Sequence, residues 1–171
     1  MIKINTQNID ALKTLKAGDI VTISGTLFTA RDAAHKKLFA LIKDKKPLPF
    51  PIKNSFVYYT GATPAKDGEP YGSCGPTTSK RMDVYTPAML DAGMKGIIGK
   101  GARTREVIDA IKKNGAVYFV AIGGAGAFYK SAIKSAEVIA FPELLSEAVT
   151  KLEVEDFECI VGIDADGNSI F

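Results

Sequence analysis

The chain has 171 residues, of which 46% are hydrophobic and 24% charged, so it can bury a sizeable core and is too apolar for general disorder. Its 22 Lys and Arg against 19 Asp and Glu leave a net charge of +3, which is too small to indicate a nucleic-acid partner. No apolar run reaches the roughly 20 residues of a transmembrane helix, so a membrane is not an expected partner either.

Strands and helices alternate along the chain, with no linker or internal repeat to divide it. Runs of β-branched and aromatic residues predict the strands, and apolar residues at helical spacing predict the helices. In chain order we expect a strand at residues 19–24, a helix at 29–42, a strand at 56–60, a helix at 86–90, a strand at 96–99, a helix at 103–114, strands at 116–122 and 136–141, a helix at 143–150, and strands at 151–157 and 159–164. This alternation favours an α/β layer fold in one domain, residues 1–171, and the strand-rich end predicts a mixed sheet flanked by helices.

Local signals set several helix boundaries. The tetrapeptide TARD has the form of a capping box, which predicts that Thr29 caps the first helix and that Arg31 lies in its first turn. Thr86 followed by Pro87 predicts an N-cap and a first helical residue, and Gly115 predicts the end of the helix before it.

Three cations fall where predicted strands give way to helices or loops. Arg31 follows the first strand, Arg81 closes the loop GSCGPTTSKR, and Lys100 lies between two glycines after the strand at 96–99. The same loop carries the hydroxyls of Thr77 and Thr78. Because ligands of open α/β sheets bind beyond the carboxyl ends of strands, these residues predict a site for a small anion with more than one carboxylate. The alternative is that they are ordinary solvated surface cations.

Other signals are weaker. The segment GGAG at 123–126 could cradle a phosphate, but a full GxGxxG is absent, so a tight turn is favoured over a nucleotide site. Cys74 lies near the predicted cations, which would lower its pKa. His35 is expected to be hydrogen-bonded locally on a helix face rather than to bind a metal. With Cys159 the chain has two cysteines in all, too few for an iron–sulfur cluster, so any such cluster must come from another chain.

Several segments share a resemblance to one family. They are GTLFTARDAAHKKL (25–38), YYTGATP (58–64), GSCGPTTSKRMD (72–83), IGKG (98–101) and the stretch 128–171. In order and spacing they resemble the β subunit, or C-terminal domain, of the class I fumarase and L-tartrate dehydratase group of iron–sulfur hydro-lyases. The resemblance implies a swivelling β/β/α fold and an enzyme of the citric acid cycle type that hydrates a small dicarboxylate reversibly. A cytoplasmic location is expected from the sequence itself, because residues 1–19 mix charged and apolar residues too evenly for a signal peptide.

The resemblance also implies roles for individual residues and for a partner. Thr77 corresponds to the catalytic base, and Arg31, Arg81 and Lys100, with Thr78 beside them, correspond to residues that bind the substrate carboxylates. The [4Fe–4S] cluster would be held by a partner α subunit in an α2β2 assembly, and this chain would supply no metal ligand. Fumarate and tartrate both stay open as substrates, since Lys80 stands where many members have a small residue. A different class of function, a non-catalytic anion-binding or assembly domain on the same scaffold, also stays open.

Overall fold

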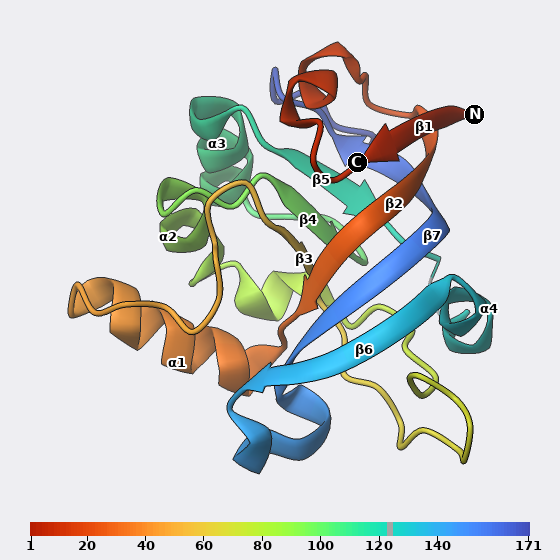
Figure 1. Cartoon of the computed structure of the whole chain (residues 1–171). Helices are drawn as coiled ribbons and strands as arrows, with labels where there is room; N and C mark the ends of the chain where they lie inside the picture. Colours follow the sequence, from red (N-terminus) through yellow and green to blue (C-terminus); the bar gives the residue numbers. More distant parts are fainter. Residues whose placement is uncertain (123–124) are drawn as a thin grey trace.

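A closed ring of strands forms the centre of the molecule (Figure 1). The computed structural model describes residues 1–122 and 125–171. The strands are β1 (Ile2–Asn5), β2 (Ile20–Thr29), β3 (Phe56–Tyr58), β4 (Gly96–Gly99), β5 (Val117–Val120), β6 (Ile133–Ala140) and β7 (Val149–Ile163). They follow the order β1-β2-β3-β4-β5-β7-β6, and a further β2–β7 pairing closes the ring of β2, β3, β4, β5 and β7.

The sheet is mixed, as the sequence predicted. Neighbours from β1 to β5 run parallel, whereas β7 is antiparallel to β2, β5 and β6. Closing the ring through β7 gives β2 and β5 partners on both edges, so these strands present no long unpaired edge.

Alternating side chains divide the hydrophobic core into two parts. Phe56 and Tyr58 of β3 belong to a cluster that fills the ring, while Val57 and Tyr59 belong to a cluster between the ring and the helices. Both clusters are buried because successive side chains of a strand point to opposite faces. The apolar runs of the central strands are therefore explained by burial on both faces.

Helices cover the ring from outside. They are α1 (Asp32–Lys43), α2 (Thr86–Asp91), α3 (Arg105–Asn114) and α4 (Gly126–Ser131), with 3-10 turns η1 (Ile9–Thr14), η2 (Ser79–Met82) and η3 (Pro142–Glu147). α1, α2 and α3 lie together on one side of the ring, and α4 lies on the other (Figure 1). The α/β fold class with a mixed sheet flanked by helices is thus confirmed. Among the described residues, no helix is long and apolar enough to cross a membrane.

The C-terminal strands differ from the prediction. The expected strands at 151–157 and 159–164 are one strand, β7, which bends where Asp156 adopts a positive φ of 52°. The pairing of β2 with β7 shifts register between Ile23 and Gly25, and the Asp156 N–H donates to Ser24 Oγ at 3.0 Å. A bulge therefore replaces the expected break.

The first helix begins later than its capping signal predicted. β2 continues to Thr29, and α1 starts at Asp32 with Arg31 at the N-cap position in an extended conformation. The Thr29 hydroxyl instead accepts from the Thr150 N–H at 3.0 Å and donates to the Ala148 carbonyl at 3.2 Å. Because β7 satisfies this hydroxyl, Thr29 joins two strands and does not cap the helix.

Three other boundaries need correction. The predicted helix at 143–150 is the 3-10 turn η3 followed by the start of β7, since Leu145 has φ 54° and ψ −115° and cannot continue a helix. Tyr85 occupies the N-cap position of α2, and Thr86 is already helical, with its hydroxyl donating to the Met82 carbonyl at 3.0 Å. α3 begins at Arg105 rather than at 103, although its end at Gly115, with φ 59°, is confirmed. β1 and α4 were not predicted from the sequence.

Candidate functional site

The loop after β3 lies along the carboxyl ends of β3 and β4. The Thr77 N–H donates to the Tyr59 carbonyl at 2.8 Å, which ties the loop to the end of β3. Thr78 pairs with Lys100 in a parallel bridge, and the Ser79 N–H donates to the Lys100 carbonyl at 3.1 Å. The loop thus brings Thr77 and Thr78 to the carboxyl ends of parallel strands, where the sequence predicts the anion site.

Arg81 lies close to both a carboxylate and the Thr77 hydroxyl. Its Nε donates to Asp32 Oδ1 at 2.9 Å and its Nη2 to Asp32 Oδ2 at 3.2 Å, a bidentate pair. Nη2 also donates to Thr77 Oγ1 at 2.8 Å. The hydrogen bond from Arg81 is the main reason that the pKa of Asp32 lies below its usual range, so Asp32 is ionised at neutral pH.

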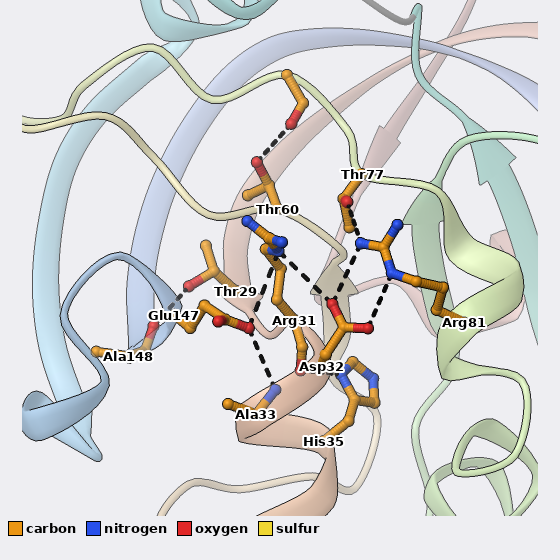
Figure 2. A network of polar contacts seen from close by, with 11 residues as sticks. Thr29, Arg31, Asp32, Ala33, His35, Thr60, Thr77, Arg81, Glu147 and Ala148 are labelled. Carbon is orange, nitrogen blue, oxygen red and sulfur yellow. Dashed lines mark hydrogen bonds and ion pairs between the residues drawn. The ribbon is translucent and has the colours of Figure 1, made fainter.

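Arg31 approaches the same carboxylate from the other side. Figure 2 shows Arg31 and Arg81 pointing toward Asp32 from two directions. Arg31 Nε is buried, at 3.8 Å from Asp32 Oδ2 and 3.9 Å from Glu147 Oε1. A Cβ at Gly61 would lie 2.9 Å from Arg31 Cδ, so only glycine allows the arginine to pass at this point.

Glu147 caps α1 from the far end of the sequence. Its Oε1 accepts from the Ala33 N–H at 3.2 Å, which satisfies one of the free N–H groups in the first turn of the helix. The carboxylate therefore caps α1, the role that the sequence predicts for Thr29. It also places a negative charge beside Arg31.

The structure brings together most of the predicted site residues. Arg31, Thr77 and Arg81 share one hydrogen-bonded and ion-paired group through Asp32. Thr78 is exposed beside the backbone of the half-buried Lys100. Lys100 thus lies opposite the residue that follows Thr77. Among the described residues, no ion pair reaches the Lys100 ammonium.

Two functional candidates were missed from the sequence. Asp32 was interpreted only as part of a capping box, although its place directly after Arg31 in the motif TARD was a usable signal. Glu147 had no such signal, because its partners Arg31 and Ala33 are more than a hundred residues away along the chain.

A buried ion pair anchors the site loop to the helices. Arg103 Nε donates to Asp83 Oδ1 at 2.6 Å, both side chains being almost fully buried. The other Asp83 oxygen accepts from the Thr104 N–H at 2.7 Å, and Arg103 Nη2 donates to Thr86 Oγ1 at 3.0 Å. These bonds connect the residue after η2 with the N-termini of α2 and α3, so the loop that carries Thr77 and Arg81 is anchored to the helical layer.

His35 and Cys74 are buried and uncharged. The His35 Nδ1 donates to the Arg31 carbonyl at 2.9 Å, which confirms the predicted local bond, and burial lowers the pKa of His35 to about 4. The interpretation of Cys74 is wrong, since burial raises the pKa of its thiol to about 12. Its backbone carbonyl accepts from the Tyr58 hydroxyl, so the residue belongs to the core.

The described residues do not form a metal site. No group of three His, Cys, Asp or Glu side chains among residues 1–122 and 125–171 is placed to hold a metal ion. Cys74 and Cys159 are free and buried, so they do not fit the ligand set of an iron–sulfur cluster. Gly123 and Gly124 of the weak phosphate signal lie outside the described residues.

An open cavity of about 510 Å³ lies between the loop after β3 and η3. It is bounded by the loop at 62–72, by Val138 of β6, by Leu145 and Ser146 of η3 and by Thr150. None of the described residues that line it carries a charge. It is therefore distinct in character from the cationic group around Thr77.

Comparison with known proteins adds to this geometry. The family model described as "Fumarase C-terminus" matches residues 1–171. The chain is 42% identical over 156 residues to "Fumarate hydratase 2" of Leishmania major, an alignment that covers 90% of this chain and 28% of the relative. It is 42% identical over 153 residues to "Fumarate hydratase class I, anaerobic" of Escherichia coli (strain K12), covering 88% and 28%.

A third relative is of similar length to this chain. The "Putative L(+)-tartrate dehydratase subunit beta" of Methanocaldococcus jannaschii is 37% identical over 166 residues, covering 94% of this chain and 85% of the relative. The chain therefore spans most of a separate β subunit but only about 28% of the length of the fumarate hydratases it matches.

Proposed function

Because this chain belongs to the Fumarase C-terminus family, we propose that it is the β component of a hydro-lyase that adds water reversibly across the double bond of a dicarboxylate. Fumarate with malate, or tartrate with its dehydration product, is the proposed substrate pair. The names of the related proteins support this class of reaction and both substrates.

One observation carries the proposal for the site. The Thr77 hydroxyl accepts a hydrogen bond of 2.8 Å from Arg81, beside a second arginine and at the carboxyl ends of β3 and β4. We propose that Arg31, Arg81, Lys100 and Thr78 bind the substrate carboxylates and that Thr77 removes the proton next to one of them. Loss of this proton creates a carboxylate with two negative oxygens, which fixed guanidinium groups stabilise.

Thr77 needs help to act as a base, because a threonine hydroxyl is a very weak acid. The donated bond from Arg81 favours the alkoxide form over the neutral hydroxyl. We propose that a carboxylate of the partner chain accepts the proton that the Thr77 hydroxyl loses when it is activated.

The [4Fe–4S] cluster is assigned to a partner α chain in an α2β2 assembly. The described residues of this chain offer two buried thiols and no three-ligand group, so they do not fit a cluster. The roles proposed for this chain are therefore limited to substrate binding and proton transfer.

The test is a comparison of threonine variants in the assembled complex. We expect Thr77→Ala to co-purify with the α chain and to lose about 100-fold or more of kcat for malate or tartrate dehydration under anaerobic conditions, the range of general acid–base effects. Thr14→Ala is the matched control, because it removes an exposed hydroxyl that donates to the Ala11 carbonyl, and we expect it to keep full turnover.

Two results would contradict the proposal. Near-normal turnover of Thr77→Ala would remove Thr77 from the chemistry. A wild-type complex that binds these dicarboxylates but turns none of them over would favour the non-catalytic anion-binding domain.

A further inference from the structure

Arg81 needs an external partner to hold its orientation. Its side chain is 47% exposed and extends from the short turn η2, where a long side chain has many accessible rotamers. Asp32 is the first residue of the twelve-residue helix α1, and a short aspartate side chain on a helix is far less mobile. The two bonds from Nε and Nη2 therefore fix the guanidinium relative to α1.

The same contact decides where the second hydrogen of Nη2 points. One hydrogen of Nη2 is donated to Asp32 Oδ2, and the bond to Thr77 Oγ1 uses the other. Since Nε and Nη2 form one edge of a rigid planar group, docking this edge on Asp32 aims the remaining Nη2 hydrogen at Thr77. Figure 2 shows Asp32, Arg81 and Thr77 in this sequence of contacts.

We propose that Asp32 is a positioning residue that orients Arg81 so that it donates to the Thr77 hydroxyl. The inference rests on the proposed role of Thr77 as the base. Asp32 acts through Arg81 and needs no contact with the substrate.

The charge of Asp32 separates this role from substrate binding. The carboxylate lies between Arg31 and Arg81, so it reduces the positive potential that attracts a dicarboxylate. Removing the charge without changing the size of the side chain thus strengthens or preserves substrate attraction, while it weakens the hold on Arg81. Arg81 is also proposed to bind substrate, and the gain in attraction offsets its looser hold in KM, whereas nothing offsets that looser hold in kcat. A positioning residue at this place therefore predicts a fall in kcat without a rise in KM.

The experiment uses Asp32→Asn in the complex of this chain with its α partner. We expect kcat to fall about 10- to 100-fold, the cost of misplacing a catalytic group, with KM unchanged or lower. Asp109→Asn is the matched control, because Asp109 makes an exposed ion pair with Arg105 on α3. We expect this variant to keep the wild-type kcat and KM. Asp32→Glu retains the charge at the start of α1 but moves the carboxylate. Its KM should therefore equal that of the wild type, while its kcat should stay below the wild-type value.

A second measurement uses the full chain alone and does not depend on turnover. The sequence has four arginines, which are Arg31, Arg81, Arg103 and Arg105. A nitrogen–proton correlation spectrum therefore contains few arginine Nε–H signals, and the signal that disappears in Arg81→Lys is that of Arg81. We expect the Arg81 signal to be protected from exchange in the wild type and in Asp109→Asn, and to broaden in Asp32→Asn.

The outcomes separate this inference from the proposed function. Wild-type kcat in Asp32→Asn, or a raised KM with unchanged kcat, would overturn the positioning role. An Arg81 signal that is identical in wild type and Asp32→Asn would also overturn it. If the wild-type complex has no activity, the proposed function fails, and the spectrum still decides whether Asp32 orients Arg81.

Discussion

His35 connects the buried face of α1 to the site. It lies one helical turn after Arg31, donates from Nδ1 to the Arg31 carbonyl, and packs edge-on to Tyr59 with ring centroids 4.5 Å apart. A carbonyl oxygen only accepts, so Nδ1 carries the proton and the neutral ring leaves Nε2 as an acceptor. Among the described residues Nε2 has no hydrogen-bond partner, so burial of the imidazole costs free energy. The bond from Nδ1 holds Arg31, the residue before Asp32.

Burial of His35 predicts a pH dependence of stability. Burial lowers the pKa of His35 in the folded chain to about 4, against 6.5 for the free side chain, so between these pH values the unfolded chain binds more protons. The free energy of unfolding should therefore fall as pH decreases from 6.5 toward 4, by roughly 3 kcal/mol at most. Urea unfolding of wild type and His35→Phe at pH 7.5 and 4.5 measures this, and the variant should lose less stability across that range.

The histidine also offers a direct check, because it is the only one in the sequence. Its imidazole NMR signals should show no titration between pH 5 and 8. Titration with a midpoint near 6.5, or an equal loss of stability in wild type and variant, would contradict the buried neutral ring.

At the scale of elements, the contact between η2 and the end of β4 holds the site loop. A Cβ at Gly99 would lie 1.9 Å from Ser79 Oγ and 3.1 Å from Ser79 Cβ. Ser79 Oγ accepts from the Lys100 N–H at 3.0 Å, so loop and strand touch without a side chain between them. The glycine at the end of β4 is required by this close approach and not by its φ angle.

Gly99→Ala should push η2 away from β4. We expect a loss of about 1–3 kcal/mol in the free energy of unfolding, the usual cost of forcing extra volume into a packed site. Gly75→Ala is the matched control, since a Cβ there meets its nearest neighbour at an ordinary 3.5 Å. Denaturant unfolding gives both values, and the added change Ser79→Gly should restore part of the loss. Equal stability of Gly99→Ala and wild type would show that the loop is not held in this way.

At the scale of the whole molecule, closure of the ring shields both thiols from solvent. Cys159 of β7 lies opposite Val21 of β2 inside the ring, and Cys74 packs in the same cluster. Burial raises the pKa of Cys74 to about 12 and that of Cys159 well above its usual value. Neither thiol is available as a thiolate in the folded chain.

Thiol labelling should therefore report the opening of the whole ring. We expect a disulfide reagent such as Ellman's to modify no cysteine of the native chain on the time scale of minutes and two cysteines in denaturant. The native reaction should slow further when the fold is stabilised by osmolyte, because labelling requires opening. Rapid release of one thiol equivalent from the native chain would contradict burial of both residues.

Much of the ring could be predicted from local pattern. The strand at 96–99 agrees with β4, the strand at 116–122 contains β5, and the glycine that ends α3 was identified from its type alone. These features depend on backbone preferences and on burial of both strand faces, which neighbouring residues express directly. The clustering of Arg31, Thr77 and Arg81 was also foreseeable, because the carboxyl ends of parallel strands meet at one edge.

Contacts between distant residues were decided only by the tertiary structure. Arg81 and Asp32 are 49 residues apart, and Ala33 and Glu147 are 114 apart, so no local pattern indicates either bond. The same holds for β7, whose length follows from pairing with β2, β5 and β6 at once. The sequence by itself predicted which cations and hydroxyls the candidate site contains, since these are matters of residue type and strand order. The orientation of these side chains, the protonation of their partners and the cap of α1 depend on distances in space. Those distances exist only once the ring has closed.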